Sequence, residues 1–527
     1  MKTIFAAIAF CLSLQAGALE YENWSFTVSG GVATLTGYSG EGPADLVLPS
    51  TVTADGTNYT VTAVGSSAFS GKSWIKTLQM PDTIRGIGNS AFENCRALQS
   101  IEVPGSVTNI GRSAFNSCTN LVTATLNEGV VSIDDYAFYN CSSLLVASVP
   151  NSVTNLGSSA YAYCYALTNI PLRGGWNPTQ SGRFPSGAGN LDTIEIIGNG
   201  DLVIGEQTFG DHYDSSVFKE RHLKISGVKS IANHHAFGYS PNLETVEFGD
   251  NALENIGERS FDSCRALKSI EVPGSVTNIG SYAFYGCTNL VAATLNEGLL
   301  TINNNAFENC SSLLVASVPN SVTNLGSSSY AYCYALTNIT LRGGWNPTQS
   351  GRFPSGAGNL DTIEIIGNGD LVIGDRTFGN HYNSGVLKER HLKISGVKSI
   401  ANEYAFGCSP NLETVEFIGN ALENIGARSF SGCQALKSVE IPSSVTNIAS
   451  YAFYECGVLK SVVFKSAEAP TVGGDAFGYV PADATFYIYE GSTGYDTTQY
   501  PWNRFSVVTL MDDGSVGQSG AINASVT

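Results

Sequence analysis

The sequence predicts a repeat solenoid, a β-rich fold of the α/β class in which similar coils stack on one another. One observation is a pattern, C-x2-L-x2-I-x-V-P-x2-V-x2-I-G-x2-A-F-x2-C, that runs from Cys95 to Cys118 and recurs along the chain. Another is an aromatic anchor that returns with most steps at 23 residues. A fixed period of about 20 to 50 residues indicates units that bury their apolar faces against their neighbours. The anchors are Phe69, Phe92, Phe115, Phe138, Tyr161, Phe184, Phe209, Phe237, Phe261, Phe284, Phe307, Tyr330, Phe353, Phe378, Phe406, Phe430, Phe453 and Phe477.

The first half of the pattern predicts a short strand. Leu98, Ile101 and Val103 are apolar, and the alternation across Ile101-Glu102-Val103 places two side chains inward and one outward. Pro104 then ends the strand, because proline has no N–H to donate to a neighbouring strand.

The second half of the pattern predicts a return path that closes the coil. Val107 and Ile110 are apolar residues expected to point back into the core. Gly111 fits a turn with unusual backbone angles or a close approach. Ala114 is small where one turn packs against the next, and Phe115 fills the interior. A single coil cannot bury these residues alone, so stacked coils share one core.

The pattern resembles the BspA-like leucine-rich repeats of secreted and surface proteins. Cys-x2-Leu-x2-Ile-x-Val-Pro, with Ile110-Gly111 and Ala114-Phe115, matches that family at every coil position, over roughly Val61 to Phe477. The resemblance implies a leucine-rich-repeat right-handed solenoid of about 18 coils, with parallel strands on one face and short helical turns on the other. It also implies adhesion or partner binding rather than catalysis.

Five segments are expected along the chain. Residues 1–18 have the composition of a secretory signal peptide, with an early lysine, an apolar run too short for a membrane span, and small residues at the cleavage site. Residues 19–60 are expected to form an N-terminal β cap, which the open end of a solenoid needs. The solenoid follows over 61–477 and a C-terminal cap over 478–510. The polar, Gly/Ser-rich residues 511–527 are expected to be a disordered tail.

A longer repeat lies above the coils. Residues 92–260 correspond to residues 261–429, and a third, partial copy starts at 430. The stretch from Leu172 to Gly205 recurs unchanged from Leu341 to Gly374, an offset of 169 residues. The array is therefore an internal duplication of a seven-coil block.

The composition favours a soluble protein outside the cytoplasm. The formal net charge is −18, the sequence pI is about 4.7 and no lysine/arginine cluster occurs, so nucleic acid and anionic membrane surfaces are poor partners. After residue 18 no apolar stretch is long enough to span a bilayer, and membrane insertion is not expected. We expect a secreted or cell-surface monomer whose partners are extracellular proteins or glycans.

Twelve cysteines in an exported chain raise the question of disulfides. Ten of them lie three residues after an anchor, so stacked coils bring them to a spacing of about 4.8 Å, within reach of a bridge. Side chains in such a ladder point the same way, however, and buried free thiols are the preferred interpretation over bridges. Cys408 lies one position out of register. The ten are Cys95, Cys118, Cys141, Cys164, Cys264, Cys287, Cys310, Cys333, Cys433 and Cys456.

No cofactor, metal site or catalytic centre is expected. The cysteines form no CxxC motif, and the pair His234-His235 becomes Glu403-Tyr404 in the internal copy. Solvated polar loop residues are therefore a better interpretation of these histidines than metal ligands. Neither a G-x-S-x-G nucleophile elbow nor a phosphate-binding loop is present.

Candidate binding residues come from the outward positions of the strands. Glutamates occupy several of these positions, and Thr, Ser and Val occupy others, which suits a docking surface better than a catalytic cleft. A second group combines a tryptophan, an arginine and an asparagine in one irregular coil and its copy. A plain solvated face is the alternative for both groups. The candidates are Glu102, Glu195, Glu247, Glu271, Glu364, Glu416, Glu440, Asn169, Arg173, Trp176, Asn338, Arg342 and Trp345.

The sequence thus predicts a non-catalytic protein that serves adhesion or extracellular binding. Two alternatives stay open. A secreted solenoid enzyme that degrades polysaccharides would need two or three carboxylates at a fixed separation on one face. A passive structural or spacer protein of the surface would need no specific site.

Overall fold

The computed structural model of the chain divides into two compact units, Met1–Glu195 and Ile196–Thr527. The signal peptide expected at 1–18, the tail expected at 511–527, and the candidates Trp176 and Trp345 lie outside the described residues. The structure describes residues 19–175, 192–205, 209, 221–232, 234–344, 359–375, 377–378, 389–401 and 403–510.

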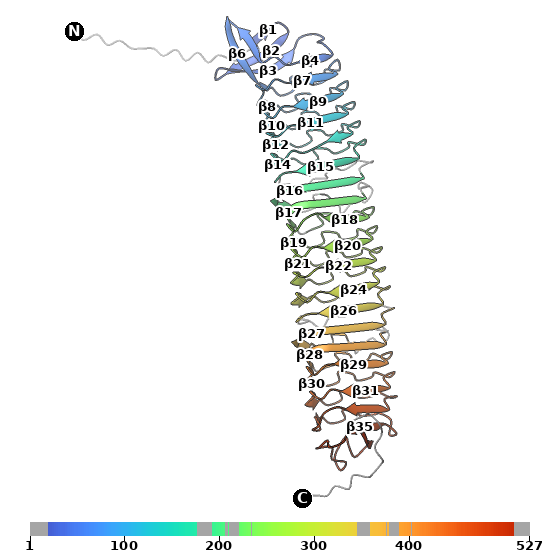
Figure 1. The fold of residues 1–527 in the computed structure, drawn as a ribbon. Coiled ribbons are helices and arrows are strands. Elements are labelled where there is room, and N and C mark those ends of the chain that lie inside the picture. Colours follow the sequence, from blue (N-terminus) through green and yellow to red (C-terminus); the bar gives the residue numbers. More distant parts are fainter. Residues whose placement is uncertain are drawn as a thin grey trace, which may run out of the picture. The chain divides into compact units, whose positions relative to one another are not determined.

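The first unit contains two sheets, one with the order β1-β2-β3-β6-β8-β10-β12-β14 and β5 beside β6, the other with the order β13-β11-β9-β7-β4 (Figure 1). Each regular coil thus contributes one strand to each sheet. The strands are β1 (Leu19–Tyr21), β2 (Trp24–Ser29), β3 (Val32–Tyr38), β4 (Asp45–Val47), β5 (Thr51–Ala54), β6 (Thr57–Val64), β7 (Thr77–Gln79), β8 (Gly86–Ile87), β9 (Ser100–Val103), β10 (Asn109–Ile110), β11 (Thr123–Leu126), β12 (Ser132–Ile133), β13 (Val146–Ala147), β14 (Asn155–Leu156) and β15 (Asn169–Arg173).

The pairing in the first unit changes from antiparallel to parallel along the chain. β2 and β3 form an antiparallel hairpin around Gly30 and Gly31. From β6 to β8 and beyond, coil follows coil in parallel register: Ile101 on β9 lies opposite Ala124 on β11, and Ile110 on β10 lies opposite Ile133 on β12. The parallel solenoid that the sequence predicts is confirmed in this unit.

The anchors form a column of stacked rings inside the coils. The ring centroids of Phe92 and Phe115 lie 5.3 Å apart with planes 5° apart, and those of Phe115 and Phe138 lie 5.2 Å apart at the same angle. All three side chains are fully buried. A stacked pair of this kind adds about 0.5–1.5 kcal/mol beyond the burial of its area. Ring stacking of one coil on the next therefore favours a constant step along the chain.

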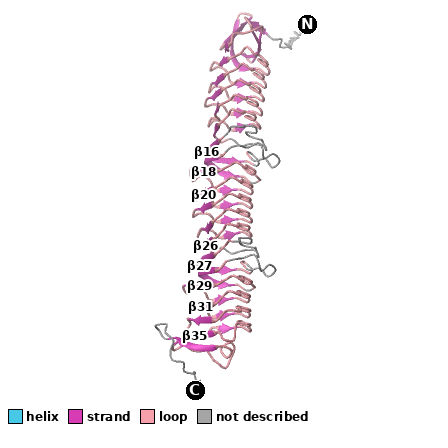
Figure 2. Cartoon of the chain, turned by 90° about the vertical axis from the view of Figure 1, so that its right-hand side faces the viewer, coloured by secondary structure: helices cyan, strands magenta, loops and turns pink. Residues whose placement is uncertain are grey.

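The remaining side of each coil is a turn, and here the structure differs from the short helical turns expected. Across the described ranges no residue lies in a helix (Figure 2). Ser113 and Ser117 have φ angles of 56° and 60°, and such left-handed residues interrupt a right-handed helix. Their N–H groups donate to the carbonyl oxygens of Asp135 and Tyr139 in the next coil. The turns are thus hydrogen-bonded from coil to coil.

The second unit repeats this plan, with parallel strands on two sides of the coil and turns on the third (Figure 1). Its strands are β16 (Thr193–Ile204), which starts at the end of the first unit, β17 (His222–Ile231), β18 (Thr245–Phe248), β19 (Asn255–Ile256), β20 (Ser269–Val272), β21 (Asn278–Ile279), β22 (Ala292–Leu295), β23 (Thr301–Ile302), β24 (Val315–Val318), β25 (Asn324–Leu325), β26 (Asn338–Arg342), β27 (Thr362–Ile373), β28 (His391–Ile400), β29 (Thr414–Ile418), β30 (Asn424–Ile425), β31 (Ser438–Ile441), β32 (Asn447–Ile448), β33 (Ser461–Phe464), β34 (Thr471–Val472), β35 (Thr485–Tyr489) and β36 (Ser506–Leu510).

Long strands interrupt the regular coils of the second unit, among them β27 and β28. β28 pairs with β29 along its first half and with β30 at its end, so one strand serves both sides of the coil. It bends at Gly396, whose φ is 60°. A Cβ on Gly396 would lie 2.2 Å from the carbonyl oxygen of Gly367, so only glycine allows β27 and β28 to approach here.

A ladder of free cysteines runs beside the anchors. The thiol of Cys118 donates to the carbonyl oxygen of Phe92 at 3.2 Å, and that of Cys287 donates to the carbonyl oxygen of Phe261 at 3.3 Å. All ten cysteines of the ladder are buried and free, which confirms the preference for thiols over bridges. Burial raises the pKa of the Cys95 thiol to about 12. The cysteines therefore serve as small apolar side chains that also satisfy an interior carbonyl.

Candidate functional site

The outward side of the longer strands carries the candidate binding residues, and we call it the strand face in each unit. Alternation along these strands points Ile101 and Val103 inward and leaves Glu102 exposed, as predicted. None of the described candidates is buried. In the first unit Glu102 lies on β9, Asn169 and Arg173 on β15, and Glu195 on β16; in the second, Glu247 lies on β18, Glu271 on β20, Asn338 and Arg342 on β26, Glu364 on β27, Glu416 on β29 and Glu440 on β31.

The strand face of the first unit is hollowed between β7 and β9. This hollow, groove 1, has a volume of about 630 Å³. Its lining carries two carboxylates together with amide and backbone groups. It includes Gln79, Met80, Asp82, Glu102, Pro104 and Asn127.

The second unit has a comparable hollow, groove 2, between β18 and β20. Its volume is about 690 Å³. Three carboxylates contribute to its lining, so the groove is acidic. The lining includes Glu247, Asp250, Asn251, Glu271, Pro273 and Asn296.

Both grooves form where neighbouring strands separate. β18 pairs with β20 only at Thr245 and Ser269, whereas β20 and β22 stay in register over four residues, Ser269 to Val272. In the first unit β7 and β9 pair at two positions, the last of which joins Leu78 to Ile101. Beyond these positions the strands diverge, and the space between them opens the strand face.

One wall is the same in both grooves. Glu102, Pro104, Gly105 and Asn127 in groove 1 correspond by the 169-residue offset to Glu271, Pro273, Gly274 and Asn296 in groove 2. The side chain of Asn127 donates to Glu102 Oε1 at 3.1 Å, and that of Asn296 donates to Glu271 Oε1 at 3.3 Å. In each groove the asparagine amide thus fixes the glutamate side chain by a hydrogen bond. Because the amide is neutral, it does not neutralise the charge of the carboxylate.

Other glutamates of the strand face have cationic partners. Lys224 Nζ lies 3.7 Å from Glu247 Oε2, and Lys393 Nζ lies 4.0 Å from Glu416 Oε2. In contrast, Glu102 and Glu271 have no cationic partner within the described part of the chain. These two groove carboxylates therefore keep an uncompensated negative charge.

Next to each groove the strand face carries exposed aliphatic side chains. Val122, Leu145 and Val146, which we call patch 1, are exposed to 38%, 48% and 60%. Patch 2 in the second unit consists of their counterparts Val291, Leu314 and Val315, exposed to 43%, 46% and 54%. Contiguous exposed apolar side chains with a polar rim are typical of interaction sites.

The candidates Asn338 and Arg342 border patch 2. Asn338 lies opposite Val315 in the sheet, and Arg342 Nη1 donates to Ser317 Oγ at 2.8 Å. Asn169 and Arg173 occupy the matching positions on β15 of the first unit, where both are exposed. The structure therefore places these candidates at the rim of the patches.

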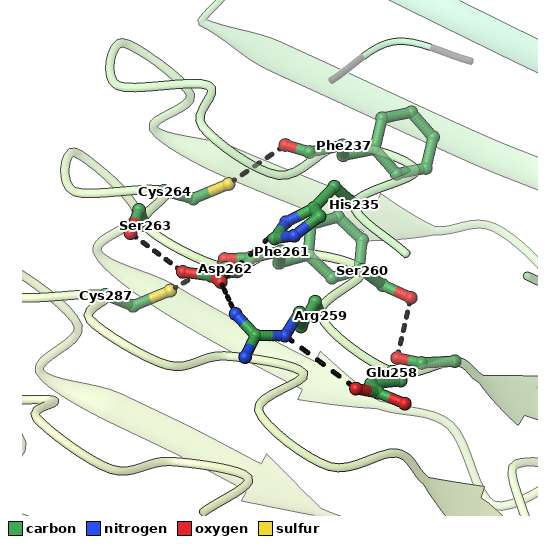
Figure 3. A network of polar contacts seen from close by, with 11 residues as sticks. His235, Phe237, Glu258, Arg259, Ser260, Phe261, Asp262, Ser263, Cys264 and Cys287 are labelled. Carbon is green, nitrogen blue, oxygen red and sulfur yellow. Dashed lines mark hydrogen bonds and ion pairs between the residues drawn. The ribbon is translucent and has the colours of Figure 1, made fainter. Parts of the chain in front are cut away.

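A buried polar network lies on the turn side of the second unit (Figure 3). His235 Nδ1 lies 3.7 Å from Asp262 Oδ2, and Arg259 Nη1 lies 3.1 Å from the same oxygen. Ser263 Oγ donates to Asp262 Oδ1 at 2.8 Å. His235 and Asp262 are 7% and 1% exposed, so the prediction of a solvated loop is wrong for His235. Asp262, which lies one coil later in the sequence, offsets the cost of burying the polar ring of His235.

The network is not a feature that every copy shares, because the equivalent coil of the next copy lacks it. Tyr404 stands where His235 stands, and Ser431 stands where Asp262 stands. Arg428 then lies over the rings of Tyr404 and Tyr451, at 5.9 Å and 5.0 Å from their centroids. The contact with Tyr451 has a counterpart in the preceding copy, where Arg259 lies 4.6 Å from the centroid of the Tyr282 ring. Only the cation–π contact with Tyr404 therefore takes the place of the ion pairs.

Metal-binding clusters and membrane-spanning helices are both absent from the described residues. These residues include no group of three or more His, Cys, Asp or Glu side chains placed to hold a metal ion. They also include no helix that is long and apolar enough to cross a membrane.

The sequence patterns did not reveal the grooves or the patches. Alternation identifies outward residues one strand at a time, whereas a groove depends on the divergence of two strands. One signal was available for groove 2, because the step from Phe237 to Phe261 is 24 residues instead of 23. For the patches, the signal in the sequence was a valine or leucine at a predicted outward position, such as Val146, because an apolar side chain there is exposed.

A comparison with protein-family models identifies the repeats of this chain. The family model described as "BspA type Leucine rich repeat region (6 copies)" matches residues 56–168, 229–356 and 398–491, more than half of the chain. No curated protein matches the sequence.

Several solved structures are similar to the chain. A leucine-rich repeat protein from Bacteroides ovatus is 19% identical, with 93% of this chain and 99% of that chain covered and a TM-score of 0.36. A leucine-rich cell surface protein from Faecalibacterium prausnitzii is also 19% identical, with 93% and 97% covered and a TM-score of 0.25. A leucine-rich repeat protein from Bacteroides capillosus is 25% identical, with 30% and 99% covered and a TM-score of 0.22. By the family model that spans most of its coils, the chain belongs to the BspA-type leucine-rich repeat family.

Proposed function

We propose that the protein is a non-catalytic binding protein of the cell surface or extracellular space, and that its strand face docks extracellular partners. The observation that carries this proposal is the recurrence of one groove wall, Glu102 with Asn127 and Glu271 with Asn296, in both units. A solvated face without a ligand gives no reason for exposed aliphatic side chains beside each groove. Membership of a family of secreted and surface proteins supports the location.

The chemistry of the strand face suits binding rather than catalysis. Glu247 is engaged by Lys224, and Glu364 Oε2 accepts a hydrogen bond from Thr340 Oγ1 at 3.2 Å. An inverting or retaining glycosidase needs one carboxyl group held as an acid beside a second at a fixed separation. Glu247 and Glu271 line the same groove, but Glu247 lies beside Lys224, Glu271 accepts from Asn296, and neither side chain is buried as a protonated acid would require.

A binding panel tests this function. The purified chain is immobilised and exposed to purified extracellular matrix proteins, plasma proteins and arrayed glycans at physiological salt. We expect saturable binding of at least one partner, and a loss of at least about tenfold in affinity, or 1.4 kcal/mol, when Glu102 and Glu271 are both changed to Gln. As a matched control, Glu455→Gln removes an exposed carboxylate from the turn side and should change nothing.

Two outcomes would replace the proposal. Saturable binding of no partner on the panel would favour the passive spacer. Release of reducing sugar from plant or host polysaccharides, lost on Glu247→Gln, would establish the polysaccharide-degrading enzyme.

A further inference from the structure

Groove and patch occur together, in the same order and register, in both units. In the first unit Ser100, which lines groove 1, lies opposite Thr123, and Thr123 lies opposite Val146 of patch 1. In the second unit Ser269, which lines groove 2, leads to Val315 of patch 2 through Ala292 in the same way. Val122 and Val291 therefore lie beside the first strand after the groove, and Val146 and Val315 lie on the second.

This geometry sets the distance between the two parts. Two parallel strand steps span about 9.6 Å, and the two residues from Ser269 to Glu271 add about 6.6 Å along the strand. The diagonal from Glu271 to Val315 is then roughly 12 Å, the reach of about four residues of extended chain. Residues four apart in an extended segment also point to the same side.

The two parts differ in chemistry. The groove offers Glu102 or Glu271, each with its charge uncompensated among the described residues. The patch offers valine and leucine side chains about half exposed. A neutral glycan supplies no cation for the groove, and a polyamine supplies no branched apolar group for the patch. An extended protein segment with a basic and an apolar side chain supplies both.

The third, partial copy lacks both features. Lys465 takes the place of Asn296 and lies 2.5 Å from Glu440 Oε2. Lys460 takes the place of Val291, and its ammonium lies 2.6 Å from Asp483 Oδ2. Thr485 takes the place of Val315 in the sheet. The carboxylate is neutralised and the aliphatic surface is replaced by an ion pair.

We infer that each unit binds an extended protein segment that places a Lys or Arg side chain in the groove and an aliphatic or aromatic side chain, about four residues away, on the patch. This inference rests on the proposed binding function and names its partner as a protein. The third, partial copy, in which Lys465 replaces the groove asparagine and Lys460 replaces a patch valine, does not bind such a segment.

Synthetic peptides test the inference directly on the full chain. The probes are twelve-residue peptides in a Gly/Ser background, with Lys at the fourth and Leu at the eighth position, or in the reverse order. We expect one order to bind with two peptides per chain by fluorescence anisotropy and calorimetry. Exchange of Lys for Glu, or of Leu for Ser, should weaken binding by about tenfold or more, because each loss removes one of the two contacts.

Variants locate the sites. Glu102→Gln and Glu271→Gln should each remove one of the two bound peptides, and Val146→Thr with Val315→Thr should weaken both sites without a change in volume. Glu440→Gln is the matched control and should leave binding unchanged. Thermal unfolding confirms that each exposed substitution leaves the fold intact.

The failures of the two proposals differ. If neither peptide order binds better than its Glu or Ser version, the inference is wrong, even where the binding panel finds a glycan or folded protein partner. Equal effects of Glu440→Gln and Glu271→Gln would also overturn it. If no member of the binding panel binds the chain, the peptide measurement still decides whether the inference holds.

Discussion

The ammonium of Lys465 lies 2.5 Å from the carboxylate of Glu440, at the place where Asn296 donates a hydrogen bond to Glu271. One substitution between internal copies thus converts an open acidic groove wall into a closed ion pair. An exposed pair of this kind contributes about 0.2–1 kcal/mol to stability, so its removal is tolerated. The lysine in the third copy therefore changes the charge of the groove wall and contributes little to the stability of the fold.

The first prediction follows from that difference. The quadruple variant Lys460→Val, Lys465→Asn, Asp483→Leu, Thr485→Val restores the groove and patch residues in the third copy. We expect a third Lys/Leu peptide to bind per chain, with the affinity of the first two. Calorimetric stoichiometry measures this, and a folded variant that still binds only two peptides contradicts it.

The second prediction concerns the buried network of His235 and Asp262. Asp262→Ser removes the buried carboxylate that accepts hydrogen bonds from Arg259 and Ser263 and faces the ring of His235, which should lower the unfolding free energy by about 1–3 kcal/mol. The double variant His235→Tyr, Asp262→Ser reproduces the residues Tyr404 and Ser431 of the next copy and should recover most of this loss. Urea unfolding checks both. Equal stability of the single and double variants contradicts the prediction.

The third prediction concerns pH. Glu389 is 2% exposed, and burial raises its pKa from the usual 4.5 to about 7, while the side chain of Ser409 acts in the opposite direction. A carboxyl group whose pKa is higher in the folded state takes up a proton on folding. Its stability contribution is therefore fully present below about pH 4.5 and is lost as pH rises through 7.

Glu389→Gln removes this dependence. At pH 8 the variant should be more stable than the parent by up to about 3 kcal/mol, the equivalent of the pKa difference. At pH 4.5 the two proteins should be nearly equal. Urea unfolding between pH 4 and pH 8 measures the effect, and Glu455→Gln, on an exposed carboxylate, serves as the control. A constant difference at all pH values speaks against a titrating Glu389.

The fourth prediction concerns the thiols. The ten ladder cysteines are buried, whereas Cys408 is half-buried with a pKa raised by burial and by the charge of Glu455. The native protein should react with a thiol reagent at Cys408 or nowhere. Denaturation without reductant should expose all eleven cysteines of the described chain, since each is free. Cys408→Ser should abolish the native signal, and several reactive thiols in the native state would contradict the packing of the ladder.

The repeat pattern was enough to predict most of the fold, because each coil meets nearly the same neighbour. Phe115 and Ile101 were assigned to the core from spacing alone, and both are buried as predicted. The turns were predicted less well. The left-handed φ of Ser117 follows from a hydrogen bond to Tyr139 in the next coil, and serine itself carries no such preference. Contacts between coils decide the turn conformation, and a pattern within one coil does not contain them.

The candidate site shows the same limit. Glu102 and Glu271 were selected as outward glutamates, and the structure adds what distinguishes them from Glu416 and Glu440, namely the absence of a described lysine partner. That distinction depends on a residue in a neighbouring coil, about one repeat away, such as Asn296 or Lys465 in the following coil and Lys393 in the preceding one. Paired positions one coil apart are therefore the place to look for function in such sequences.

The stacking of anchors has a consequence for the gene. Phe261 stacks on Phe284 at 5.3 Å, and Phe430 stacks on Phe453 at the same distance, with planes 5° and 7° apart. Because equivalent coils present interchangeable ends, unequal recombination between copies joins a coil to a compatible neighbour in either product. A lineage carrying this protein can therefore gain or lose whole blocks by crossover, and change the length of the strand face, while each product keeps a foldable stack of coils.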